Sequence, residues 1–157
     1  MRSGIRSAAL AAMLVVMGSG LGACGGGEKK EVAQPADMAQ RSLYERLGGK
    51  EAITLVVDEF VANVAADARI NSFFAKTDIG HLKEMLVDQI CEATGGPCTY
   101  SGKDMVTAHR GMNITDAQFG ALVEDLVKAL DKYKVGETEK NQLLGALGGM
   151  KGDIVGK

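Results

Sequence analysis

The residues that follow Thr115 constrain the fold most strongly. Apolar side chains recur there every three or four positions, the spacing of a helix with one apolar face. Thr115 and Gln118 have the spacing of a capping box, which satisfies backbone N–H groups at the start of a helix. The apolar positions form one continuous stripe made of Phe119, Leu122, Val123, Leu126, Val127, Leu130 and Tyr133. We therefore expect a helix that begins at Thr115 and packs against other helices along this stripe.

Helical spacing recurs through the rest of the chain, whereas the alternation typical of strands is not found. We expect further helices at residues 42–47, 50–66, 70–74, 78–94 and 137–155, with a short one around His109. Gly48-Gly49 and Gly95-Gly96 end two of them, because glycine adopts backbone angles that other residues resist. The sequence thus predicts an all-α domain.

The N-terminal segment has the pattern of a bacterial lipoprotein signal peptide. Arg2 and Arg6 precede an apolar run over residues 8–17. This run is shorter than the roughly 20 residues that a membrane-spanning helix needs, but it suits a signal peptide. It leads to Leu21-Gly22-Ala23-Cys24, which resembles a lipobox. An ordinary secretory peptide that is cut near Ala23 is the alternative.

These features divide the chain into three parts. We predict a signal peptide over residues 1–23 and a lipid anchor on Cys24, facing the periplasm or the cell exterior. Gly25 follows Cys24. In one bacterial group an aspartate at this position retains lipoproteins in the inner membrane, and its absence here favours the outer membrane. Residues 24–41 are small and polar, which is typical of a flexible tether. Residues 42–157 are long enough for one compact domain.

Charge limits the classes of partner. The formal net charge of the chain is −2 and its basic residues form no stripe, which argues against nucleic-acid binding.

His109 is the main candidate for a functional residue. It is one of two histidines and lies about one turn after Met105. A neutral imidazole on a short helix beside an apolar pocket is a suitable axial ligand for haem iron. A histidine packed in the interior or exposed at the surface is the other interpretation. His81, the second histidine, is expected to face solvent rather than to bind a metal.

Several motifs in this order resemble those of the group I truncated haemoglobins. They are Leu43-Tyr44-Glu45-Arg46-Leu47-Gly48-Gly49, Phe73 to Asp78, Gly95-Gly96-Pro97, Tyr100-Ser101-Gly102, Ala108-His109 and Gly111 to Thr115. The resemblance covers about residues 42–155. It implies a two-over-two helical sandwich that binds haem b, with His109 as the proximal iron ligand. The residues that it implies around the haem are Phe60, Phe74, Leu82, Leu86, Tyr100, Met105, His109 and Leu147.

The expected ligand pocket departs from the family pattern. Val61 follows Phe60 where many members have a tyrosine that donates a hydrogen bond to bound oxygen. Leu82 and Leu86 occupy the other two positions that usually line the ligand. Gln89, one turn beyond Leu86, is the nearest remaining donor. These substitutions count against stable oxygen storage, because a lost hydrogen bond is worth about 1–3 kcal/mol.

Met85 is a possible sixth ligand of the iron. It matches a position where some relatives of the family place an iron-binding histidine, and a thioether there would suit electron transfer. The alternative is that Met85 only fills the rim of the pocket.

Cys91 and Cys98 remain as a pair if Cys24 is lipidated. An even number of cysteines in an oxidising compartment favours a disulfide over two free thiols. This bridge would fix the loop that leads to His109.

Three functions are compatible with these observations. The leading one is a lipid-anchored, haem-binding globin that reversibly binds a diatomic gas such as oxygen or nitric oxide. The alternative is a redox haemoprotein for nitrogen-oxide, peroxide or electron-transfer chemistry, which would need a separate reductase because the chain has no flavin or nicotinamide domain. A haem-free lipoprotein that keeps only the scaffold is the third, although packing alone does not require His109.

Overall fold

The computed structural model describes residues 40–157, and their regular structure is helical apart from one isolated bridge between Ile114 and Val155. The predicted signal peptide, Cys24 and nearly all of the tether lie outside the described residues. The elements are α2 (Leu43–Arg46), α3 (Gly49–Ala66), η1 (Asn71–Phe74), α4 (Ile79–Ala93), α5 (Met105–His109), α6 (Asp116–Lys132), α7 (Glu137–Gly148) and η2 (Lys151–Asp153). The predicted all-α class is confirmed.

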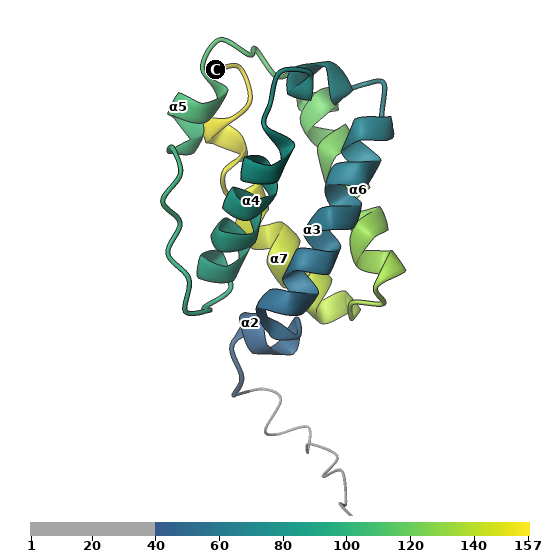
Figure 1. Ribbon diagram of the computed structural model, residues 1–157, viewed down its shortest axis with the longest axis vertical. Helices are drawn as coiled ribbons and strands as arrows, with labels where there is room; N and C mark the ends of the chain where they lie inside the picture. Colours follow the sequence, from purple (N-terminus) through teal and green to yellow (C-terminus); the bar gives the residue numbers. More distant parts are fainter. Residues whose placement is uncertain (1–39) are drawn as a thin grey trace, which may run out of the picture. The chain divides into compact units, whose positions relative to one another are not determined.

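The four longest helices form two pairs. Helix α3 packs against α4, and α6 packs against α7. The pairs are joined by contacts of α3 with α6 and of α4 with α7, and the short α2 contacts α3 and α7 (Figure 1). This arrangement is the predicted two-over-two sandwich. In residues 40–157 no helix has the length and apolar character needed to cross a membrane.

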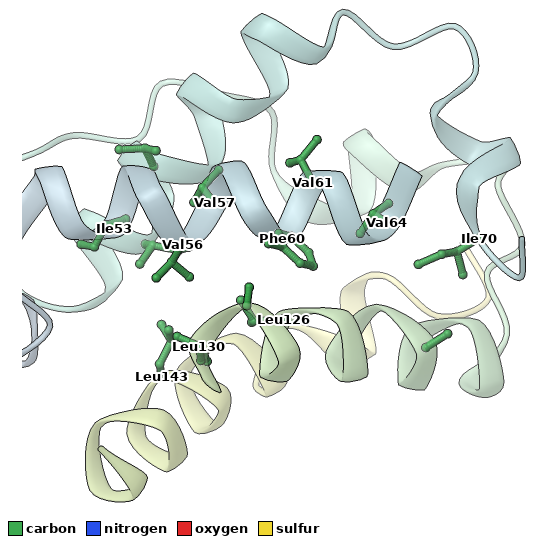
Figure 2. Packing of buried hydrophobic residues seen from close by; sticks show 14 residues of the cluster. Ile53, Val56, Val57, Phe60, Val61, Val64, Ile70, Leu126, Leu130 and Leu143 are labelled. Carbon is green, nitrogen blue, oxygen red and sulfur yellow. The ribbon is translucent and has the colours of Figure 1, made fainter. Parts of the chain in front are cut away.

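The hydrophobic core lies mainly between α3 and α6. Figure 2 shows Val56 and Phe60 of α3 pointing towards α6, while Val57 and Val61 point away from it. Side chains spaced three or four residues apart share one face of a helix, so α3 presents apolar surface to α6 and a second apolar face to α4. Helix α3 therefore contributes six buried residues, namely Ile53, Val56, Val57, Phe60, Val61 and Val64.

Several helix ends follow from their local sequence. Ser42 with Glu45, and Thr115 with Gln118, form complete capping boxes at the starts of α2 and α6. Between α2 and α3 the chain turns at Gly48, whose φ of 94° lies in the left-handed region. A side chain at Gly48 would also approach the Cβ atom of Ala52 to 2.9 Å, so glycine is required there.

The predicted last helix over 137–155 is too long. Helix α7 ends at Gly148, where a second glycine follows, and the chain continues as the short η2. Two successive glycines favour termination because they carry the lowest helix propensity apart from proline. Beyond η2 the terminal residues lie beside the turn after α5: the Gly156 amide donates to the Ile114 carbonyl (2.9 Å) and the Asn113 amide to the Lys157 carbonyl (2.7 Å).

Candidate haem site

An apolar cavity of about 190 Å³ opens beside this core. Each of the four long helices contributes to its wall, together with η1, α5 and the segment that follows α7. The lining residues are Phe60, Val61, Val64, Ala65, Phe74, Ile79, Leu82, Leu86, Gln89, Ile90, His109, Phe119, Leu122, Val123, Leu126, Leu144, Leu147, Gly148, Met150 and Ile154. Two of these side chains, Gln89 and His109, carry a nitrogen or oxygen atom. A cavity of this kind suits a large, flat and mostly apolar ligand.

The imidazole of His109 is held in a defined orientation. Its Nδ1 atom lies 2.8 Å from the carbonyl oxygen of Met105. Because a carbonyl oxygen only accepts hydrogen bonds, Nδ1 is the donor in this contact, and in the neutral imidazole the lone pair is then on Nε2. Metal-ligating histidines are commonly oriented in this way, by donating their other N–H to a carbonyl. His109 is thus prepared to bind a metal ion through Nε2.

Asp104 defines the start of the helix that carries His109. Its carboxylate accepts a hydrogen bond from the Thr107 amide at 2.9 Å, which is an N-cap interaction. Interaction with the Thr107 side chain, and then this hydrogen bond from the Thr107 amide, lower the pKa of the Asp104 carboxyl below its usual value. A helix of only five residues is marginal in isolation, so a cap matters more here than in the longer helices.

A disulfide between Cys91 and Cys98 lies just before this segment, as the sequence predicted. It joins the end of α4 to the loop that leads to α5. In the same turn the Gly96 amide donates to the Cys91 carbonyl at 2.8 Å. A Cβ atom at Gly96 would lie 2.6 Å from the Cys91 sulfur and 2.8 Å from that carbonyl oxygen, so the tight return of the chain depends on glycine. The loop therefore begins from a fixed point.

The positions predicted to surround a gas ligand do line the cavity. Val61 comes from α3, and Leu82 and Leu86 come from α4. Gln89, predicted as the nearest donor, also lines the cavity, and its amide contacts two sulfur atoms. Its Nε2 atom lies 3.6 Å from the sulfur of Met105 and 3.5 Å from that of Met150, within hydrogen-bonding range of these weak acceptors.

Three residues predicted at the site are not among those that line the cavity. Met85 is partly buried on α4 but outside the lining. Tyr100 uses its hydroxyl to donate to the Lys103 carbonyl at 2.8 Å within the loop. Met105 presents its sulfur to Gln89 instead. His81 is exposed, with 66% of its side chain accessible and Glu84 4.0 Å away, which confirms the expectation that it faces solvent.

Several lining residues were not predicted from the sequence. Apart from Gly148 they are apolar, mostly on α6 and near the end of the chain: Val64, Ala65, Ile79, Ile90, Phe119, Leu122, Val123, Leu126, Leu144, Gly148, Met150 and Ile154. Many of them belong to the apolar stripes that predicted the helices. A stripe indicates an inward face, but it does not distinguish a wall of a cavity from a packed core.

The residues present fit haem. The apolar walls would hold the porphyrin, and His109 would bind its iron through Nε2 from one side. When bound, haem would supply a redox-active iron that can take a further ligand. A two-over-two helical sandwich with one oriented imidazole in an apolar cavity defines a globin of the shortened type.

Comparison with known proteins agrees with this class. Residues 42–155 match the model of the family described as bacterial-like globin, and the chain belongs to that family. It is 34% identical over 117 residues to a group 1 truncated hemoglobin of Tetrahymena pyriformis, covering 74% of this chain and 97% of the relative. A group 1 truncated hemoglobin of Mycolicibacterium paratuberculosis is 35% identical over 122 residues, covering 78% of this chain and 86% of the relative.

Solved structures show the same likeness. The Fe(III) form of the Tetrahymena pyriformis truncated hemoglobin superposes with a TM-score of 0.72 at 34% identity, over 74% of this chain and all of that chain. The 2/2 hemoglobin of a Synechococcus species, in the cyanomet state with covalently attached heme, gives a TM-score of 0.69 at 33% identity, over 73% and 98%. The protein is thus a haem-binding truncated globin.

Proposed function

We propose that this globin reversibly binds a diatomic gas at ferrous haem, on the face of the haem opposite His109. The observation that carries the proposal is the composition of the cavity lining in the described residues. It offers one imidazole prepared for iron, whereas Met85 and His81 lie outside the lining. The thioether of Met150, which does line the cavity, accepts a hydrogen bond from Gln89. We therefore expect a gas molecule, and not a side chain of the described residues, to complete the coordination of the iron.

The test is the optical spectrum of the ferrous, haem-loaded domain before and after carbon monoxide is added under anaerobic conditions. We expect a five-coordinate high-spin spectrum that becomes six-coordinate and low-spin in a saturable manner. Met85→Leu, a substitution outside the lining, should leave the ferrous spectrum unchanged. A ferrous form that is already low-spin and six-coordinate, and that reverts in Met85→Leu, would contradict the proposal. It would support electron transfer with a separate reductase as partner.

We also propose that the globin acts outside the cytoplasm, anchored by lipid on Cys24. The lipobox-like sequence supports the anchor. The Cys91–Cys98 disulfide supports an oxidising compartment, since such bridges are rare in the cytosol of most organisms. Labelled fatty acid supplied to expressing bacteria should be incorporated into the full chain but not into Cys24→Ser. Equal labelling of both, or recovery of the full chain with the cytosolic fraction, would overturn the assignment.

A further inference from the structure

We propose that the cavity selects carbon monoxide or nitric oxide, ligands that remain nearly neutral when bound, and discriminates against dioxygen. This inference rests on the proposed gas-binding function and identifies the class of ligand. Its basis is the distribution of hydrogen-bond donors around the cavity.

The cavity offers few donors to a bound gas. Of the side chains that line it in residues 40–157, those of Gln89 and His109 carry a nitrogen or oxygen atom. Neither nitrogen of His109 is available to a gas. Nδ1 donates a hydrogen bond to the Met105 carbonyl, and Nε2 is the atom expected to bind the iron. His109 therefore cannot donate to a gas on the opposite face of the haem. Gln89 is the one donor left to consider.

The amide group of Gln89 is engaged elsewhere. Its Nε2 atom lies 3.6 Å from the sulfur of Met105 and 3.5 Å from that of Met150. Met105 belongs to α5, the helix of His109, and its carbonyl orients the imidazole. The amide thus faces the α5 side of the cavity, which is the side of the proximal ligand. Both hydrogen bonds of this nitrogen go to sulfur atoms, and neither goes to the Val61, Leu82 and Leu86 wall.

The wall expected beside the gas is made of hydrocarbon. Val61, Leu82 and Leu86 all line the cavity and have neither donor nor acceptor atoms. Dioxygen held in a haem pocket carries partial negative charge, so its affinity depends on donors in that pocket. Carbon monoxide and nitric oxide carry much less charge and lose little in apolar surroundings. The lining consequently weakens the binding of dioxygen selectively.

The experiment measures dissociation rates of dioxygen and carbon monoxide from the ferrous, haem-loaded domain by stopped-flow displacement, with nitric oxide examined anaerobically. Leu82→Gln introduces a donor, and Leu82→Met is its matched control of similar length without one. We expect Leu82→Gln to slow dioxygen dissociation about tenfold relative to Leu82→Met, and carbon monoxide dissociation less than twofold. Leu86→Gln against Leu86→Met repeats the test at the next turn. Leu55→Gln, at an exposed position of α3, should keep the wild-type ratio.

The outcomes distinguish a failure of the proposed selectivity from a failure of the proposed gas-binding function. Fast dioxygen release by the wild type, slowed by either glutamine variant, supports the selectivity. If the wild type releases dioxygen slowly, or if neither glutamine variant differs from its methionine control, the selectivity is overturned while gas binding stands. If carbon monoxide and nitric oxide fail to bind the ferrous wild type at all, the proposed function itself fails.

Discussion

The two ends of the helical sandwich are built from the same helices but differ in packing. At the end near α2, side chains from α3, α6 and α7 close to leave a void of only about 10 Å³. At the end near α5, the same helices border a cavity of about 190 Å³. The apolar stripes run through both ends without interruption. Apolar spacing therefore specifies which side of each helix is buried. It does not specify whether the space between the helices is filled by side chains.

The short α5 accounts for much of the difference. It has five residues and none of them is buried, so it cannot fill the space that the longer helices leave. At the other end Leu143 of α7 and Leu130 of α6 are each 1% exposed and complete the packing. The cavity is therefore bordered on this side by a short, capped segment that contributes one histidine to its lining.

Among substitutions that distinguish the two ends, one in the packed end near α2 is expected to have the largest effect on the free energy of unfolding. Leu130→Ala should lower the free energy of unfolding by about 2–5 kcal/mol, because a large cavity would form in a close-packed core. Leu122→Ala enlarges a cavity that already exists, so the haem-free domain should lose less. Urea denaturation of both haem-free variants measures the contrast. Equal losses would show that the cavity end is packed as tightly as the core.

The disulfide should give the next largest effect. Replacing Cys91 and Cys98 together by alanine is expected to lower the free energy of unfolding by about 2–3 kcal/mol, from the lost loop constraint. Haem should also leave faster, because the bridge anchors the loop that leads to His109. Thermal denaturation with and without reductant provides the check. Reductant should destabilise the wild type but not the double variant, and an unaffected wild type would refute a stabilising bridge.

The smallest effect should come from the cap of α5. Asp104→Ala removes the acceptor for the Thr107 amide, so haem should dissociate severalfold faster with little change in global stability. Asp104→Asn retains an acceptor and should resemble the wild type at neutral pH. Haem dissociation rates, measured by transfer to an excess of an acceptor protein, report the difference. Equal rates for Asp104→Ala and wild type would show that the cap does not position His109.

The same cap predicts a pH dependence. The pKa of Asp104 is lowered in the folded protein from 3.8, chiefly by its hydrogen bonds with Thr107. Its contribution to stability is therefore fully present above the unfolded-state value and is lost as pH falls through the lower folded value. Haem dissociation from the wild type should accelerate in that acidic range more than from Asp104→Asn. Identical acid profiles would assign the acceleration to other groups.

Local patterns predicted much of this molecule. The capping box at Thr115 and the apolar stripe after it specify α6, and the glycines at 48 and 49 mark the turn before α3. These features depend on neighbours in sequence, which a reader of the sequence can see. His109 was assigned as the iron ligand through the resemblance of the surrounding motifs to the group I truncated haemoglobins, because a lone histidine beside an apolar helix is more often a packed or surface residue.

Features that depend on distant residues were harder to predict. Gln89 was expected to be a donor near the ligand, but its partners are the sulfurs of Met105 and Met150, 16 and 61 positions away. Met85 lies on the same helix as Leu82 and Leu86, and spacing alone did not decide whether it lines the cavity. Which of several inward residues meets a cavity depends on how helices dock, and an apolar period does not encode docking.

The central claim is that His109 holds haem in this cavity, and the optical spectrum of haem-loaded His109→Gly tests it most directly. The wild-type domain should bind haem and show a ferrous spectrum with a histidine ligand. His109→Gly should lose haem or that signature, and added imidazole should restore it by occupying the vacated position. His81→Ala, which removes the exposed histidine, should match the wild type. An unchanged spectrum in His109→Gly without imidazole, or loss of the signature in His81→Ala, would contradict the account.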